Sequence, residues 1–276
     1  MCIVAIAWQL FDEMPLVLLS NRDEFLARPT KSLHQWSDQP IYAGRDSQSG
    51  GTWLGIHQQA AQDGSSIAQQ NGRWAAVLNF RDGVQADPDE RSRGELVTGF
   101  LTSELSPLAF ARQINLQQYA GFNLIVGDRQ QAVIVNNRGH APAPLHSGLH
   151  VFSNGQPEER WFKTEKLRGR LRQEVLPLIA ENGSLEYWQA AALDTMSDNT
   201  SAPDDNLPET GVPKAIEQAL SSVYIEPITL NNLDIEMPSY GTRTQSILTL
   251  RDKNDKQSNI KVQLISRETN EMIVNK

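Results

Sequence analysis

An unbroken apolar run starts at the second residue of this chain and contains its single cysteine. The seven residues from Cys2 to Trp8 carry no charged or hydroxyl-bearing side chain, a pattern typical of a strand that is buried on both faces. Such a strand needs a layered fold, because other elements must cover each of its faces. The chain is therefore expected to build sheets with helices packed against them.

The rest of the chain supplies the elements of such a fold. A second apolar run, 16–19, follows an acidic, proline-containing turn and predicts a hairpin with the first run. Further strands are predicted at 52–56, 74–80, 121–126, 132–136, 149–153, 242–250 and 260–266. Helices are predicted over 90–103, 107–116 (capped by Ser106), 158–176 (ended by Pro177), 185–193 (capped by Ser184) and 213–223. No repeat or linker divides the chain, which predicts one domain over residues 1–276.

Composition and charge narrow the classes of function. The 276 residues include 25 Lys and Arg against 33 Asp and Glu, a net charge of −8, whereas nucleic acids and anionic lipids are bound by basic patches. No stretch approaches the roughly 18 consecutive apolar residues of a membrane span, and the N-terminal run lacks the basic flank of a secretory signal. We therefore expect a cytoplasmic protein with no nucleic-acid partner and no membrane span.

A single cysteine excludes an intramolecular disulfide and any zinc site built from several thiolates. The five histidines show no metal-ligand spacing together with a carboxylate on one helix face, so they are interpreted as surface or structural residues. We expect neither a metal nor a cofactor.

The position of the cysteine suggests a chemistry. A small second residue permits removal of Met1, which would leave Cys2 with a free α-amine of pKa ~7.7–8 beside a thiol of pKa ~8.5. The amine could take the thiol proton without a distant histidine, which makes Cys2 a candidate nucleophile. The alternative interpretation is a small hydrophobic residue buried in an N-terminal strand.

A charged segment follows the second apolar run. Ser20-Asn21-Arg22-Asp23-Glu24 places a cation and two carboxylates at the end of the predicted hairpin, where burial is costly unless charges pair or take part in chemistry. If the hairpin forms, this segment lies near one end of the first strand. A carboxylate could then orient the Cys2 amine while Arg22 polarises the thiol. The alternative interpretation is a solvent-exposed charged turn.

Six short motifs occur in order along nearly the whole chain. They are Met1-Cys2, Asn21-Arg22-Asp23-Glu24, Ala43-Gly44-Arg45-Asp46, Gly50-Gly51-Thr52-Trp53-Leu54-Gly55, Ser92-Arg93-Gly94-Glu95-Leu96 and Tyr240-Gly241-Thr242-Arg243. Together they resemble the NRDE family, the transport and Golgi organisation protein 2-like proteins. The resemblance implies an N-terminal nucleophile (Ntn) hydrolase-like fold of the α+β class, a four-layer αββα sandwich of two stacked, mainly antiparallel sheets covered by helices.

The resemblance also implies a chemistry, through distant similarity to the cysteine-type amidases that cleave penicillin V and conjugated bile salts. In those enzymes an N-terminal cysteine attacks an amide, an arginine and an aspartate orient it, and an asparagine helps to hold the oxyanion. Cys2 matches the nucleophile, and Arg22 with Asp23 matches the orienting pair. The amidases separate that pair by two residues, whereas here the two are adjacent. Which of Asn21, Arg22, Asp23 and Glu24 takes each role therefore stays open.

Three further polar residues are candidates for the same site. Asn79 and Asn154, each at the end of a predicted strand, resemble oxyanion positions, and turn-forming asparagine is the alternative interpretation. Arg243 begins a late strand and either faces the pocket or lies on the surface. The Gln-rich stretch Gln58–Gln70 resembles an insertion that either covers the pocket or decorates the surface.

Two functions follow from these observations. The first is a cysteine-type Ntn hydrolase that cleaves an amide or thioester bond of a small-molecule substrate through an acyl-enzyme on Cys2. The second, implied by the family resemblance, is a non-catalytic binding and trafficking protein for haem or acyl-CoA-type hydrophobic metabolites. Both would use the same cleft.

Overall fold

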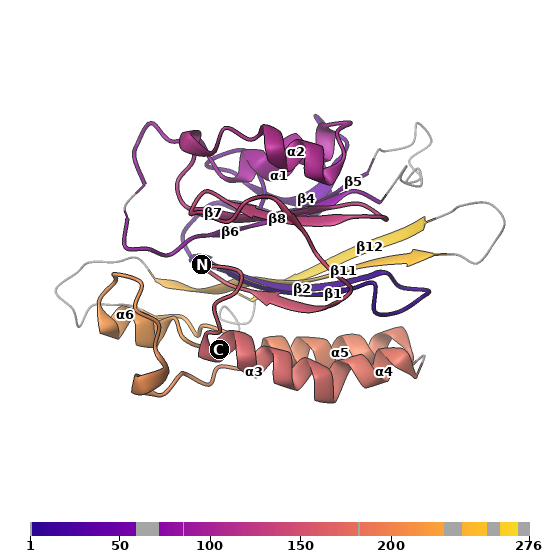
Figure 1. Cartoon of the computed structure of the whole chain (residues 1–276). Helices are drawn as coiled ribbons and strands as arrows, with labels where there is room; N and C mark the ends of the chain where they lie inside the picture. Colours follow the sequence, from indigo (N-terminus) through magenta and orange to yellow (C-terminus); the bar gives the residue numbers. More distant parts are fainter. Residues whose placement is uncertain are drawn as a thin grey trace.

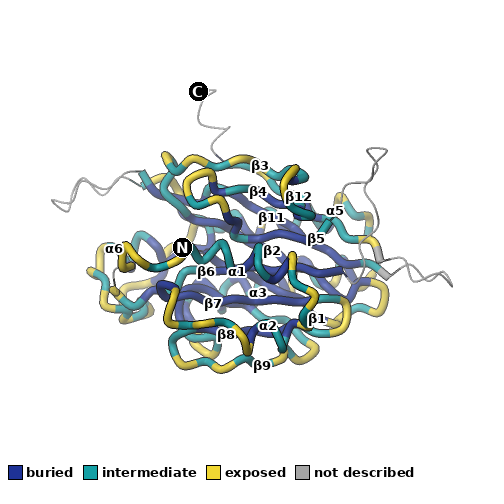
Figure 2. Tube along the Cα trace, turned by 90° about the horizontal axis from the view of Figure 1, so that it is seen from above, coloured by how far each residue is buried: buried dark blue, intermediate teal, exposed yellow. Residues whose placement is uncertain are grey.

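The computed structural model describes residues 2–58, 72–84, 86–181, 183–228, 239–252 and 260–269. In this part of the chain, two antiparallel sheets lie face to face between two layers of helices (Figure 1). The predicted α+β sandwich of two antiparallel sheets covered by helices is confirmed. Viewed from above, the strands at the centre of the sandwich are buried along most of their length, whereas exposed residues lie mainly in the connections (Figure 2).

The two sheets differ in size. The five-stranded sheet has the order β10 (Gly148–Phe152), β1 (Cys2–Trp8), β2 (Leu16–Phe25), β11 (Tyr240–Asp252) and β12 (Ile260–Glu268). The seven-stranded sheet has the order β3 (Thr30–Gln35), β4 (Ile41–Asp46), β5 (Leu54–His57), β6 (Trp74–Asn79), β7 (Phe122–Gly127), β8 (Ala132–Asn136) and β9 (Ala143–Pro144). The first two strands of the chain therefore lie inside the smaller sheet, with a neighbour on each side.

A separate group of helices covers each sheet (Figure 1). The seven-stranded sheet is covered by α1 (Gly94–Thr102) and α2 (Pro107–Gln113). The five-stranded sheet is covered by α3 (Phe162–Arg170), α4 (Leu176–Ala180) and α5 (Leu185–Met196), with α6 (Lys214–Ala219) in the same layer. Short helical turns at Leu116–Gln118, Leu171–Val175 and Asp204–Asn206 complete the described elements.

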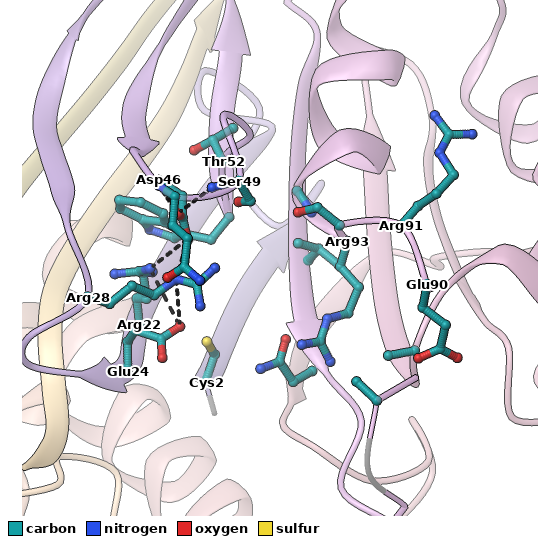
Figure 3. Close-up of a pocket in the computed structure, with 18 of the residues that line it drawn as sticks. Cys2, Arg22, Glu24, Arg28, Asp46, Ser49, Thr52, Glu90, Arg91 and Arg93 are labelled. Carbon is teal, nitrogen blue, oxygen red and sulfur yellow. Dashed lines mark hydrogen bonds and ion pairs between the residues drawn. The ribbon is translucent and has the colours of Figure 1, made fainter. Parts of the chain in front are cut away.

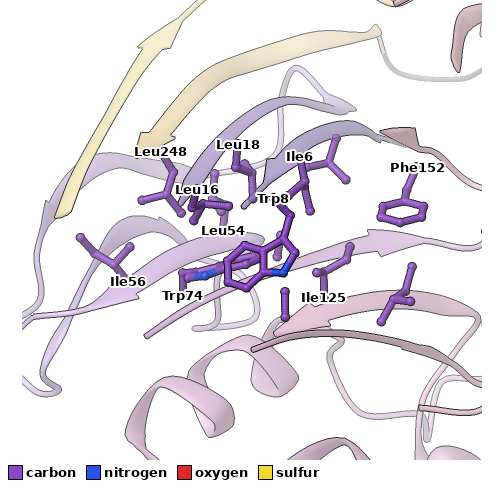
Figure 4. Close-up of a cluster of buried hydrophobic side chains, with 14 of the residues drawn as sticks. Ile6, Trp8, Leu16, Leu18, Leu54, Ile56, Trp74, Ile125, Phe152 and Leu248 are labelled. Carbon is purple, nitrogen blue, oxygen red and sulfur yellow. The ribbon is translucent and has the colours of Figure 1, made fainter. Parts of the chain in front are cut away.

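Side chains of β1 alternate between two apolar cores, as successive residues of a strand must. Its even-numbered residues face the other sheet, where the rings of Trp8 and Trp74 lie 6.4 Å apart (Figure 4). Its odd-numbered residues face the helices, where Ile3 joins a core that includes Leu167 and Trp188. The strand is buried on both faces, which is the environment that its unbroken apolar sequence predicts.

The predicted hairpin is confirmed, but its second strand is longer than expected. Cys2 lies opposite Arg22 and Trp8 lies opposite Leu16. The apolar pattern ends at Leu19, whereas β2 continues to Phe25 because β11 pairs with it along the polar segment. The charged motif is therefore part of a central strand, and its interpretation as a solvent-exposed turn is wrong.

One helix boundary and several strands also differ from the prediction. Pro177 does not end the helix that begins at Phe162: a π-helical turn precedes it, and proline in the first turn of α4 needs no backbone N–H. Strands β3, β4 and β9 are absent from the sequence-based prediction, because β3 is largely polar, β4 ends in Gly-Arg-Asp and β9 has two residues. The cap at Ser106 is confirmed, since its side chain accepts a hydrogen bond from the Ala109 N–H. Most of Gln58–Gln70 lies outside the described residues.

Truncation of Leu18 should test how far stability depends on the core between the sheets. Leu18 is fully buried and lies opposite Ile6 on one side and Leu248 on the other. We expect Leu18→Ala to lower the free energy of unfolding by about 2–5 kcal/mol in urea titrations, because it removes buried methyl groups and leaves a cavity. Leu10→Ala is the control, since Leu10 is 40% exposed. An equal loss in both variants would contradict the prediction.

Candidate active site

A polar cavity of about 430 Å³ lies at the end of the sandwich where β1 begins (Figure 3). Its walls come from β1, β2, the turn after β4, the segment before β5, the end of β6 and the start of α1. Its charged lining residues are Arg22, Asp23, Glu24, Arg28, Asp46, Asp87, Glu90, Arg91 and Arg93. Convergence of cations, carboxylates and a thiol in one concave site is typical of a site that performs chemistry.

Cys2 lies on the floor of this cavity and is held from two sides. Pairing of β1 with β2 places it opposite Arg22, and the Ser153 hydroxyl donates a hydrogen bond to its backbone oxygen at 3.0 Å. The residue is 8% exposed. Burial raises the pKa of the Cys2 thiol, although the charge of Arg22 and a hydrogen bond from the Asp23 backbone act in the opposite direction. At neutral pH the thiol therefore needs a base before it can act as a nucleophile.

Arg22 is held beside Cys2 by a network of charges. Its Nη2 lies 3.5 Å from Asp46 Oδ2 and 3.6 Å from Glu24 Oε2, and its guanidinium lies 4.2 Å from the centre of the Trp53 ring. Arg28 Nε donates to the same Asp46 oxygen at 2.6 Å. Although burial opposes ionisation of Asp46, hydrogen bonds from Arg28 and from two backbone N–H groups hold its pKa below the ordinary value. Asp46 is thus an anion that fixes two cations.

Asp23 is held by the last of the six motifs. The Thr242 hydroxyl donates to Asp23 Oδ1 at 2.7 Å, and the Tyr240 hydroxyl donates to the Asp23 backbone oxygen at 2.8 Å. Burial raises the pKa of the Asp23 carboxyl, while the charge of Lys163 and the Thr242 hydrogen bond act in the opposite direction. This carboxyl therefore lies next to Cys2 in a position set by a distant part of the chain.

A second group of buried charges lies behind Asp23, toward the helices. Lys163 is 1% exposed and donates from Nζ to the Leu220 backbone oxygen at 3.1 Å. Burial, together with the charge of Arg81, lowers the pKa of Lys163 to about 8. Arg81 in turn forms a buried ion pair with Glu217, with Nη1 and Oε2 3.1 Å apart. The electrostatic environment of Cys2 and Asp23 thus includes cations that the sequence alone did not indicate.

The two candidate oxyanion residues occupy different positions. Asn79, at the end of β6, lines the cavity. Asn154 is fully buried and lies behind it, where its Nδ2 donates to the Asn79 backbone oxygen at 2.8 Å. The Asn79 side chain can therefore contact a ligand. Asn154 instead holds the backbone at the end of β6.

Asn21 and Arg243 do not line the cavity. Asn21 is fully buried on the helix-facing side of β2, where its Nδ2 donates to the backbone oxygens of Met196 and Val223, each at 2.8 Å. Arg243 donates from Nη1 to the Leu26 backbone oxygen at 3.2 Å. Asn21 thus connects β2 to the helical layer, and Arg243 connects β11 to the loop after β2. Both residues help to position the site, but neither faces the cavity.

The cavity wall opposite Cys2 depends on two glycines. A Cβ atom on Gly51 would lie 2.7 Å from the Gly94 carbonyl carbon, and one on Gly94 would lie 2.9 Å from the Thr52 nitrogen. Glycine at both positions lets the start of α1 approach the segment before β5. Arg93 immediately precedes α1 and donates from Nη1 to the Gly121 backbone oxygen at 3.1 Å.

Several lining residues were not assigned to the site from the sequence, notably Arg28, Asp46, Trp53 and Arg93. Three of them belong to motifs that carry the NRDE resemblance. Membership of a glycine-containing motif was the signal that could have identified Asp46, Trp53 and Arg93. Arg28 has no comparable signal.

Among the described residues, no three His, Cys, Asp or Glu side chains gather in a way that could hold a metal ion. A membrane-crossing helix is likewise not found in the part of the chain that the structure describes.

Comparison with known proteins identifies the family. The Transport and Golgi organisation 2 family model matches residues 1–265. The human Transport and Golgi organization protein 2 homolog is 30% identical over 250 residues, which cover 84% of this chain and 81% of the relative. The chain belongs to the Transport and Golgi organisation 2 family.

The chain is also similar to proteins from a fly and a yeast. The Drosophila melanogaster Transport and Golgi organization protein 2 is 28% identical over 257 residues, which cover 87% of this chain and 83% of the relative. An uncharacterized protein of Saccharomyces cerevisiae is 26% identical over 293 residues, covering 90% and 87% of the two chains. The NRDE resemblance is thus confirmed, and five of its six motifs contribute to the cavity lining of this family member.

Substitution of Asn21 should separate structural from chemical roles within the family motif. Asn21→Ala removes the side-chain donor to the buried Val223 backbone oxygen, whereas the Met196 oxygen keeps a second donor in Gln245 Nε2 at 3.0 Å. We therefore expect a loss of about 1–3 kcal/mol in the free energy of unfolding. Alkylation of Cys2 by iodoacetamide in the folded variant should stay within about twofold of the wild-type rate. Asn199→Ala is the control, because Asn199 is exposed. A large change in alkylation at unchanged stability would place Asn21 in the chemistry instead.

The buried Lys163 predicts a specific pH dependence of stability. Between pH 8 and 10.5 the unfolded chain binds the lysine proton and the folded chain does not, so this residue makes stability rise with pH across that window. The unfolding free energy of wild type minus that of Lys163→Met should therefore rise by up to about 3 kcal/mol between pH 7 and 10. Lys214→Met is the control, since Asp204 raises the pKa of the exposed Lys214. A flat difference in urea titrations would contradict the prediction.

Proposed function

We propose that this protein is an N-terminal nucleophile hydrolase that cleaves an amide or thioester bond, with Cys2 as the nucleophile after removal of Met1. The observation that carries the proposal is the position of the Cys2 thiol on the floor of a polar cavity, opposite Arg22 and beside Asp23. The sandwich of two antiparallel sheets between helical layers, with this cysteine at the start of a central strand, supports an Ntn hydrolase-like fold. We propose that the whole chain acts as one cytoplasmic domain.

The raised thiol pKa explains why a free amino terminus matters. A neutral thiol is a poor nucleophile, and an α-amine of pKa ~7.7–8 is a suitable base at neutral pH. Once Met1 is removed, the Cys2 amine would take the thiol proton, and the sulfur would attack the carbonyl carbon of the substrate. The Asp23 carboxyl, held by Thr242, would orient the resulting ammonium.

The remaining steps use groups on the cavity wall. The side-chain amide of Asn79 can donate to the oxyanion of the tetrahedral intermediate. Collapse of this intermediate breaks the carbon–nitrogen or carbon–sulfur bond, and the leaving group takes the proton from the ammonium. Water then attacks the thioester on Cys2, releases the acid and restores the thiol.

Binding and trafficking of haem or acyl-CoA-type metabolites is the alternative use of the same cavity. The lining contains four arginines and five acidic residues but no histidine among the residues that the structure describes. Haem sites are usually apolar, so although Cys2 is a residue type that can serve as an axial ligand, the charged lining does not fit a haem. The charged lining therefore favours a polar substrate and the hydrolase proposal.

Covalent trapping on Cys2 tests the proposal. A panel of N-acyl amides and acyl thioesters, quenched rapidly, should give an acyl adduct on Cys2 by mass spectrometry. Cys2→Ser should lower turnover by a factor of at least about 100 with little change in ligand affinity, because an alcohol is far less ionised than a thiol. Intact mass of the untagged protein should show loss of Met1.

Two results would overturn this proposal. Quantitative retention of Met1 would leave no free α-amine to act as the base. Saturable haem or acyl-CoA binding without an adduct from any substrate, and with unchanged affinity in Cys2→Ser, would favour the trafficking function.

A further inference from the structure

Arg93 faces Cys2 across the cavity. It lies at the start of α1, whereas Cys2 and Arg22 belong to the five-stranded sheet on the opposite wall (Figure 3). Its Nη1 donates a hydrogen bond to the Gly121 backbone oxygen at 3.1 Å. This bond fixes one nitrogen of the guanidinium. Cys2, Glu24 and Glu90 favour the charged form of Arg93 from a distance, whereas the charge of Arg28 acts in the opposite direction.

The other lining arginines are neutralised, but Arg93 is not. Asp46 and Glu24 each pair with both Arg22 and Arg28, and Glu95 pairs with Arg91 at 2.6 Å. No carboxylate of the described residues lies within 4 Å of the Arg93 guanidinium. A largely buried cation without an ion pair is costly, and burial lowers the pKa of Arg93 accordingly. An anionic group from a ligand would remove that cost.

We propose that Arg93 binds an anionic group, a carboxylate or a phosphate, on the substrate and thereby restricts the substrate class to negatively charged acyl compounds. This inference rests on the proposed function, because it assigns the substrate of the same site. Guanidinium suits the task, since its parallel N–H groups match the oxygens of a carboxylate or phosphate. The substrate would lie between the two walls, with its anionic group at Arg93 and its carbonyl carbon at the Cys2 sulfur.

The glycine contact in the wall supports this role. Gly51 and Gly94 pack backbone against backbone, so the segment that carries Arg93 is anchored to the segment before β5. A cation on an anchored segment loses little conformational entropy when it binds a ligand. Arg93 is therefore placed in advance rather than recruited by the substrate.

Alkylation of Cys2 tests the inference without requiring catalysis. In both iodoacetate and iodoacetamide the thiolate sulfur attacks the methylene carbon and displaces iodide, but the two reagents differ in charge. Cys2 is the single cysteine of the chain. We expect Arg93→Gln to lower the ratio of the iodoacetate rate to the iodoacetamide rate by about fivefold at low salt. Any change in thiol pKa alters both rates alike and cancels in the ratio.

Arg91→Gln is the matched control, because it removes the same charge two residues away at a position that Glu95 neutralises. Its ratio should stay within about twofold of wild type. Arg93→Lys, which keeps the charge, should retain more of the ratio than Arg93→Gln. If Arg93→Gln fails to fold, Arg93→Met, which also removes the charge, is measured in its place. An unchanged ratio in Arg93→Gln, or an equal loss in Arg91→Gln, would overturn the inference.

Protection experiments distinguish the two anions. Glutarate and glycerol phosphate should each be tested for slowing of the iodoacetamide reaction in wild type and in Arg93→Gln. Protection by one of them that is lost in the variant identifies carboxylate or phosphate as the group recognised, whereas protection by neither would overturn the inference. A charge-dependent ratio in a protein that forms no acyl adduct would disprove the hydrolase and leave the anion site standing.

Discussion

The antiparallel pairing of β1 with β2 is the constraint on which the rest of the structure depends. Both strands lie inside a sheet with a neighbour on each side, and β1 is buried on both faces. A shift of one residue in their register would move every apolar side chain of β1 to the wrong core. The register that buries β1 correctly also places Cys2 opposite Arg22. Folding and site assembly therefore rest on the same set of contacts.

Burial of so many charges near one thiol needs compensation, and the structure supplies it in two ways. On the cavity side, the two carboxylates of Asp46 and Glu24 pair with Arg22 and Arg28. On the helix side, Arg81 and Glu217 form an ion pair at less than 5% exposure. Replacing such pairs by apolar residues is often neutral or stabilising in proteins. Their presence beside Cys2 is therefore not explained by stability alone.

The family motif in β2 divides its residues between two tasks because side chains of a strand alternate in direction. Arg22 and Glu24 point toward Asp46 at the cavity. Asn21 points the other way and holds backbone oxygens of the helical layer. A motif of four consecutive polar residues thus serves both the site and the packing of the sheet against its helices, so its presence in a sequence does not by itself assign four residues to catalysis.

The sequence by itself determined the class of the fold and identified Cys2 as the candidate nucleophile. Unbroken apolar runs predicted buried strands, and the hairpin from 2 to 19 was correct because its pattern is local. The tertiary structure decided the rest: β2 extends through the charged motif because β11, more than 200 residues away, pairs with it. It also decided that Asn79 faces the cavity while Asn154 supports it, and that Arg93 lies opposite Cys2. These positions depend on contacts between distant segments, and local hydropathy carries no information about such contacts.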